Sequence, residues 1–318
     1  MIISKTPFRV SLFGGSTDYE SFYSKHGSLL IGFGINKYCY TSVRETPSIF
    51  DYLTRISYSK VEIVNDNENI QHNGVRGVLK YLNKYKGYEI SHMSDLPSQT
   101  GTGSSSSFIV GLLNCFTRDW SPKMLAKSAI HVERKLLEEA GGIQDQIWAA
   151  YGGMNSVGIS QDGSFSVRPL PVSEEFKQDF MNRCIMIYTG KTRKSYKIAE
   201  SHDKQDAEKH KINILEQAQR AYELFQAEDI EGIAECLGKS WENKKRISPL
   251  VSTPAVNKMY KSLESDGMMG GKLLGTGGSG FIFGILNEDT DVFKIKEKYK
   301  SHYIDIDISE KGSVIINE

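Results

Sequence analysis

The chain has few cysteines, and none of them forms a recognisable pair. Cys39, Cys115, Cys184 and Cys236 lie far apart, with no Cys-x-x-Cys spacing. This argues against a zinc ribbon and against a disulfide framework. Cys115 falls in an apolar run with helical spacing, so we expect it in the core. A reducing, cytoplasmic compartment fits this cysteine usage best.

Long apolar runs and an excess of either charge are also absent. No apolar stretch reaches the roughly 18 residues of a membrane-spanning helix, and the N-terminus lacks the apolar core of a signal peptide. Lys and Arg number 39, as do Asp and Glu, so the formal net charge is 0. We therefore expect neither nucleic acid nor a membrane surface as a partner.

Length and pattern indicate two domains of mixed strands and helices. The 318 residues suffice for two cores, and Pro169 and Pro171 mark a boundary. We expect one domain over residues 1–168 and a second over residues 169–318. Strands are predicted at residues 2–13, 28–43, 56–64, 184–188, 281–286 and 303–308, and helices at 75–85, 108–116, 122–139, 143–150, 203–225, 230–241, 254–263 and 291–299.

The most informative stretch is rich in glycine and serine and runs directly into a predicted helix. It reads LPSQTGTGSSSS over residues 96–107, and the apolar run from Phe108 to Phe116 follows it. Glycines let the backbone approach a ligand, and unpaired N–H groups at a helix N-terminus favour an anion. A nucleotide triphosphate site is our hypothesis, and a simple serine-rich helix cap is the alternative. The stretch lacks the Lys-Ser/Thr ending of a Walker loop.

A second glycine cluster, GTGGSG at residues 275–280, formally matches the dinucleotide pattern G-x-G-x-x-G. That pattern has to open a helix inside a βαβ unit, whereas this cluster precedes the strand-like run FIFGIL. A Rossmann site is therefore not expected. Two interpretations remain, a tight hairpin or a backbone wall that lies close to a phosphate or a substrate.

Two carboxylates stand out among many by their position. Glu133 has apolar neighbours at helical spacing, and Asp145 lies between Ile143 and Ile147, where a solvated acid is not expected. Each could hold a metal ion or move a proton, and a capping or surface role is the alternative. The seven histidines form no metal-spaced pair. An ordinary salt bridge would by itself explain Arg9 in a strand.

Three segments together resemble the GHMP kinase superfamily, in the order in which the family has them. They are Pro7 to Tyr19 (PFRVSLFGGSTDY), Pro97 to Ser106, and Lys272 to Gly280. Thr102 and Ser106 replace the usual Leu and Ala of the second motif. The resemblance implies an α+β fold, with an N-terminal ribosomal-S5-like domain and a C-terminal ferredoxin-like domain. It also implies an active site between them, ATP and Mg²⁺ as cofactors, and an ATP-binding loop at residues 97–107.

The same resemblance assigns roles to individual residues. Asp145 would be the catalytic aspartate and Arg9 its partner, while Ser105 and Glu133 would bind Mg²⁺. The nucleotide phosphates would be held by Gly101, Thr102, Gly103, Ser104, Ser105 and Ser106. The residues expected on the substrate side are Asp18, Gly14, Gly15, Ser16, Thr17, Gly277 and Gly278. Arg193, Lys194 and Arg76 are the candidates for a second phosphate site, because Arg binds phosphate in a fork.

Within the family, the chain most resembles the heptose 7-phosphate kinases, in residues 6–19, 96–114 and 188–193. Galactokinases have GEHTDY where this chain has GGSTDY at residues 14–19. Because this chain has neither the Glu nor the His of that motif, we do not expect galactose to be its substrate. We expect transfer of the γ-phosphoryl group of ATP to the anomeric hydroxyl of D-glycero-D-manno-heptose 7-phosphate. The 1,7-bisphosphate would serve synthesis of a nucleotide-activated heptose for capsule or another surface polysaccharide.

The alternatives are a related sugar-1-kinase for fucose or an N-acetylhexosamine, and a non-catalytic sugar sensor on the same fold. Binding alone does not need a catalytic pair, which disfavours the sensor. A small sugar phosphate is the expected partner, and the sequence leaves open whether the protein forms a homodimer.

Overall fold

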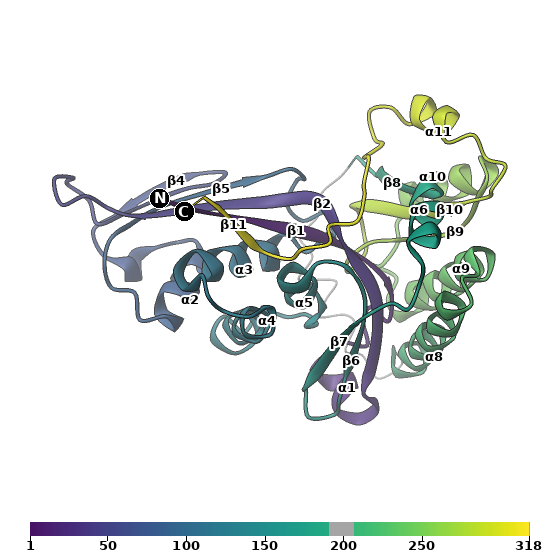
Figure 1. The fold of residues 1–318 in the computed structure, drawn as a ribbon, viewed down its shortest axis with the longest axis horizontal. Coiled ribbons are helices and arrows are strands. Elements are labelled where there is room, and N and C mark those ends of the chain that lie inside the picture. Colours follow the sequence, from purple (N-terminus) through teal and green to yellow (C-terminus); the bar gives the residue numbers. More distant parts are fainter. Residues whose placement is uncertain (191–206, 318) are drawn as a thin grey trace.

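The computed structural model describes residues 1–190 and 207–317. Within these ranges, the N-terminal half is built on a sheet of eight strands. Six follow the order β11-β1-β2-β5-β3-β4, while β6 pairs with β2 and β7 pairs with β6. The strands are β1 (Ile2–Phe13), β2 (Ser28–Glu45), β3 (Thr54–Ser57), β4 (Val61–Val64), β5 (Tyr88–Ser94), β6 (Met154–Ile159), β7 (Phe165–Pro169) and β11 (Val314–Asn317). Helices α2 to α5 lie together on one side of this sheet (Figure 1).

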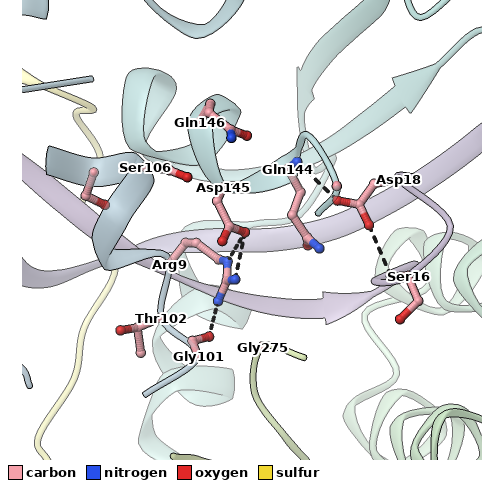
Figure 2. A network of polar contacts seen from close by, with 12 residues as sticks. Arg9, Ser16, Asp18, Gly101, Thr102, Ser106, Gln144, Asp145, Gln146 and Gly275 are labelled. Carbon is pink, nitrogen blue, oxygen red and sulfur yellow. Dashed lines mark hydrogen bonds and ion pairs between the residues drawn. The ribbon is translucent and has the colours of Figure 1, made fainter. Parts of the chain in front are cut away.

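Strands β1 and β2 are long and antiparallel, and they extend from the first half of the molecule toward the second (Figure 1). Residues Thr6 to Phe13 of β1 are all buried. The register between the strands shifts at Pro7 and Phe8, where proline has no N–H to donate. Such irregularities commonly redirect side chains near active sites. Arg9 follows this one directly and points its side chain toward α5 (Figure 2).

The glycine- and serine-rich stretch leads into the central helix of the first half, as predicted. Helix α3 begins at Ser104, and its middle is fully buried against β1 and β2. Helix α4 begins with Ser121 as its cap and Pro122 in its first turn, which is also confirmed. It then changes into a π-helical turn, η2, so the single helix predicted to residue 139 is interrupted. These elements are α1 (Glu20–His26), η1 (Asn67–Asn69), α2 (Asn73–Tyr81), α3 (Ser104–Thr117), α4 (Pro122–His131), η2 (Val132–Leu136) and α5 (Gln144–Tyr151).

The second half combines a smaller sheet with helices. In the described residues this sheet has three strands, in the order β8-β10-β9, and α8 packs against α9, which packs against β9. The glycine cluster connects β9 to β10 as a tight turn between strands, as expected. The elements are α6 (Glu174–Asn182), β8 (Cys184–Tyr188), α8 (Ala207–Gln226), α9 (Ile230–Ile247), α10 (Pro254–Ser265), β9 (Met268–Leu273), β10 (Phe281–Leu286) and α11 (Val292–Lys298).

The end of the chain differs from the prediction. Residues 303–308 do not form a strand and make only isolated bridges, at Tyr303 and Ile308. The last strand is instead β11, which pairs with β1 and brings the two termini side by side (Figure 1). The division at residue 168 therefore stays a prediction, and this strand joins the first sheet.

Cys39, Cys115, Cys184 and Cys236 are buried, and each is a free thiol. Among the described residues, no helix is both long enough and apolar enough to cross a membrane.

The two glycine-rich segments pack backbone against backbone. A Cβ atom at Gly275 would overlap the Cα of Gly101, and one at Gly280 would overlap the carbonyl oxygen of Thr100. A Cβ at Gly101 would in turn lie 2.5 Å from the carbonyl oxygen of Leu274. Glycine is required here because two main chains have to touch. We call residues 97–107 the serine loop and residues 274–280 the β9–β10 turn. The turn forms a backbone wall against the serine loop, which is one of the two interpretations predicted for the glycine cluster.

This packing predicts that Gly275→Ala is more destabilising than its backbone angle alone explains. The matched control is Gly163→Ala, since Gly163 also has a positive φ but leaves 3.4 Å to its nearest neighbour. Both variants should lose stability for the left-handed backbone. Gly275→Ala should lose about 1–3 kcal/mol more through overpacking, measured by denaturant unfolding. Equal losses would contradict the close packing of the two loops.

Candidate active site

A cleft lies where the serine loop, the start of α5 and the β9–β10 turn meet. Its N-terminal wall includes Arg9, Ser11, Gly15, Ser16, Asp18, Gly101, Gly103, Ser104, Ser105, Ser106, Glu133, Gln144 and Asp145. The opposite wall is made by Lys244, Lys272, Leu274, Gly275, Thr276, Gly277 and Ser279. Most of the residues that the sequence singled out therefore share one cleft.

The centre of the cleft is an ion pair between Arg9 and Asp145 (Figure 2). Arg9 is 3% exposed, and its Nε and Nη2 donate to Asp145 Oδ1 at 2.9 and 2.7 Å. Its Nη1 donates to the carbonyl oxygen of Gly101. The Asp145 side chain is 27% exposed, and its Oδ2 lies toward Gly103. The carboxylate is thus fixed through one oxygen at the edge of the serine loop.

A second carboxylate of the cleft lining, Asp18, is completely buried. Its two oxygens accept hydrogen bonds from the backbone N–H groups of Ser16, at 3.1 Å, and Gln144, at 3.2 Å (Figure 2). Burial raises the pKa of Asp18, and the negative charge of Asp145 raises it further. A Cβ at Gly142 would overlap this carboxylate. Asp18 is therefore held rigidly by backbone from two segments.

The serine loop leaves the N-terminus of α3 available for a ligand. Gly103 is the cap residue, with φ of 79°, and no side chain of the described chain caps the helix. Ser105 is exposed at the cleft, whereas Ser107 is buried and donates to the carbonyl oxygen of Pro7 at 2.9 Å. The N–H groups of the first turn thus face the cleft without a capping side chain, an arrangement that suits an anion.

Glu133 is buried on the π-helical turn at the other side of this loop. The hydroxyl of Ser106 donates to both of its oxygens, at 2.8 and 3.1 Å, and Gln146 Nε2 donates as well. Burial raises the pKa of Glu133 to about 7, against the opposing charge of Arg134. The serine on Glu133 is Ser106, whereas the resemblance had paired it with Ser105. Across the described ranges, no three His, Cys, Asp or Glu side chains gather as a metal site.

Two buried lysines in the cleft were missed from the sequence. Lys244 on α9 and Lys272 on β9 are 4% and 3% exposed. Their ammonium groups donate to the carbonyl oxygens of Gly275 and of Leu12, the latter at 2.8 Å. Burial lowers the pKa of Lys244 to about 8 and lowers that of Lys272 strongly. The sequence did contain a signal for their burial. Lys244 falls on the apolar stripe of its helix and Lys272 falls in a β-like run, and lysine is rarely buried at such positions.

Several predicted site residues support the cleft from behind and do not line it. Thr17 donates to the carbonyl oxygen of Gly14 at 2.7 Å, and the carbonyl oxygen of Thr102 accepts from the Arg9 N–H at 3.2 Å. Gly278 donates its N–H to the carbonyl oxygen of Val251. These residues fix the loops that carry the lining residues.

Of the residues predicted for a second phosphate, the structure describes Arg76 alone. Arg76 is absent from the lining of the cleft, because its guanidinium group is bonded locally, to the Ile70 carbonyl oxygen and to Asn73 Oδ1. Arg193 and Lys194 lie outside the described residues.

Three of the buried polar atoms that lack a partner among the described residues belong to the cleft lining. Ser11 Oγ, Gln144 Oε1 and Ser279 Oγ are buried and have no hydrogen-bond partner among the described residues. Buried polar atoms are satisfied in nearly all folded proteins. Their grouping in one cleft points to a polar ligand that completes them.

Family models match both halves of the chain. Residues 73–153 match the GHMP kinases N terminal domain, and residues 221–305 match the GHMP kinases C terminal domain. Together these matches cover more than half of the 318 residues. The chain belongs to the GHMP kinase family. It is therefore an ATP-dependent phosphotransferase, and the expected α+β fold with two GHMP kinase domains is confirmed.

Two of three similar proteins align with this GHMP kinase over nearly its full length. A D-glycero-alpha-D-manno-heptose 7-phosphate kinase of Campylobacter jejuni is 26% identical, with 98% of this chain and 97% of the relative aligned. An L-fucokinase/L-fucose-1-P guanylyltransferase of Bacteroides fragilis is 26% identical over 71% of this chain and 26% of its own length. The crystal structure of a D-glycero-D-manno-heptose 1-phosphate kinase from Bacteroides thetaiotaomicron has a TM-score of 0.82 at 22% identity, covering 100% and 99% of the two chains.

The buried position of Glu133 predicts a pH-dependent stability. The folded state keeps its proton up to about pH 7, whereas the unfolded chain releases it near 4.5. Stability should therefore fall as the pH rises between these values. Glu133→Gln removes this loss, so its melting temperature should rise relative to the native chain by a few degrees between about pH 5 and about pH 8.

The measurement is thermal unfolding in a chelator, with Glu288→Gln in an exposed loop as the control. A difference between Glu133→Gln and the native chain that stays constant across this pH range would contradict the buried charge.

Proposed function

We propose that the protein phosphorylates the anomeric hydroxyl of D-glycero-D-manno-heptose 7-phosphate with ATP and yields the 1,7-bisphosphate. The observation that carries the proposal is the Arg9–Asp145 pair at the edge of an uncapped, serine-lined helix start. The full-length similarity to the Campylobacter heptose 7-phosphate kinase supports this acceptor. The product would lead toward a nucleotide-activated heptose for a surface polysaccharide, made in the cytoplasm.

Asp145 is the residue that we assign to the acceptor hydroxyl. Its Oδ1 is occupied by Arg9, so Oδ2 would accept the hydroxyl proton as the sugar oxygen bonds to the γ-phosphorus and the bond from that phosphorus to the departing ADP breaks. Arg9 would fix the carboxylate and balance charge that develops near it. Phosphoryl transfer depends mainly on positioning and charge neutralisation, which such a pair can supply.

The serine loop fits the phosphates of ATP. The first-turn N–H groups of α3 face the cleft, and Gly101 and Gly103 have positive φ angles that hold the loop open. We assign the phosphates to this loop, from Gly101 to Ser106. The Thr102 side chain is buried and would act through its backbone.

Magnesium fits the oxygen donors beside the loop. Mg²⁺ binds few protein oxygens when phosphates and water complete its shell. We assign Glu133 and the exposed hydroxyl of Ser105 to the ion, with Ser106 orienting the Glu133 carboxylate. When bound, the ion would neutralise phosphate charge.

The sugar would occupy the end of the cleft that Asp18 closes. Each oxygen of Asp18 accepts one hydrogen bond, from a backbone N–H group. Each can therefore accept a further hydrogen bond, from a sugar hydroxyl. Gly15, Ser16 and Gly277 line the same space. Because Gly15 has no side chain, the space beside Ser11 Oγ and the Gln144 amide stays open.

L-Fucose is the second candidate acceptor. The similarity to the fucokinase of Bacteroides fragilis covers 71% of this chain, although that relative is much longer. The two acceptors differ in charge, which the two buried lysines of the cleft would distinguish.

The test is a coupled assay of ADP release with a panel of acceptors. The panel contains heptose 7-phosphate, heptose 1-phosphate, the unphosphorylated heptose, galactose, L-fucose and mevalonate. We expect turnover to be fastest with heptose 7-phosphate, and phosphorus NMR should show a new anomeric phosphate in the product. Turnover confined to an unphosphorylated sugar would reject the proposed acceptor.

Asp145→Asn should separate binding from chemistry. The variant keeps the shape of the side chain but cannot take the hydroxyl proton, so turnover should fall by about 10²–10⁴-fold. The nucleotide dissociation constant, measured by calorimetry, should change little. Asp119→Asn, on an exposed turn, is the matched control and should behave as the native chain. Native turnover by Asp145→Asn would remove Asp145 from its assigned role.

A further inference from the structure

Two buried lysines of the cleft have no carboxylate close enough to pair with them among the described residues. Arg9, Lys244 and Lys272 are all at least 96% buried, and they share the cleft with Arg134 and with four carboxylates, those of Asp18, Glu133, Glu139 and Asp145. Arg9 is paired with Asp145. The two ammonium groups donate to backbone carbonyl oxygens, and neither forms an ion pair with a described residue.

Buried lysines of this kind are rare, because an unpaired ammonium group loses its hydration without gaining a counterion. A purely structural role does not explain two of them in one cleft, since like charges repel in a medium of low polarity. Both belong to the C-terminal half and face the wall that carries Asp18. The arrangement is complete only when an anion lies between the two halves.

The opposite wall supplies a hydroxyl and free space for that anion. Lys272 binds the carbonyl oxygen of Leu12, and the preceding residue, Ser11, has a buried Oγ without a partner among the described residues. A Cβ at Gly15 would lie 3.3 Å from that oxygen. The glycine thus leaves open the space beside Ser11.

We propose that Lys244, Lys272 and Ser11 form the subsite for the second, non-reacting phosphate of the sugar phosphate acceptor. The inference rests on the proposed function and specifies how that acceptor is selected. The ATP phosphates already have the N-terminus of α3, whereas these residues face Asp18, at the sugar end. This subsite replaces the one predicted at Arg76, whose guanidinium group donates its hydrogen bonds to Ile70 and Asn73.

The first test compares heptose 7-phosphate with the same heptose lacking its phosphate. Lys272→Met should lower kcat/KM for heptose 7-phosphate by about 10- to 100-fold, the loss expected for one charged hydrogen bond. The loss with the unphosphorylated heptose should be at least about tenfold smaller. Lys272→Arg should restore part of the activity, and Lys258→Met, on an exposed helix face, is the control.

The second test needs no variant and therefore does not depend on folding. Inorganic phosphate should inhibit the native enzyme competitively with heptose 7-phosphate, and not competitively with ATP. Inhibition competitive with ATP alone would overturn the subsite.

Equal losses by Lys272→Met on the two heptoses would also overturn it, because the lysine would then act on the transferred group. In that case the proposed function would stand. If the native enzyme instead turned over no sugar phosphate at all, the acceptor would be wrong and the subsite would fall with it.

Discussion

The contact of Arg9 with Asp145 and Gly101 holds the catalytic part of the molecule together. One guanidinium group joins strand β1, the start of α5 and the serine loop. It is almost fully buried, so removal of Asp145 would leave an uncompensated charge. The pair thus fixes both the carboxylate and the loop that would hold ATP.

The rest of the cleft follows from two constraints on the chain around this pair. Glycines at residues 101, 275 and 280 let the serine loop and the β9–β10 turn touch through their main chains. The wall so formed brings Lys244, which binds the Gly275 carbonyl oxygen, into the same cleft. Buried charges on Glu133, Lys244 and Lys272 reduce stability, as is common where a site is built for a charged ligand.

Local signals account for what the sequence predicted well. The start of α3 after Gly103, the cap of α4 and the turn after β9 all depend on short patterns of Gly, Ser and Pro. The resemblance to the family likewise assigned Arg9, Asp18, Glu133 and Asp145 to one site, and all four line the cleft. Their chemical roles stay predictions.

The predictions that failed concern features that depend on tertiary contacts between distant segments. Residues 303–308 alternate as a strand should, but they divide their backbone contacts between β8 at one end and β2 at the other, and no local pattern shows this. Arg76 was chosen for its charge alone, and its local hydrogen bonds are not visible in the sequence. Lys244 and Lys272 lie 28 positions apart on different elements, so only the fold shows that they meet.

The central claim is that Arg9 and Asp145 act as one unit, and a double-mutant cycle tests it most directly. Turnover would be measured for Arg9→Met, Asp145→Asn and the double variant. We expect the double variant to be no slower than the slower single variant by more than about threefold, because each change already disables the pair. Losses that multiply in the double variant would show that the two residues act independently and would contradict the account.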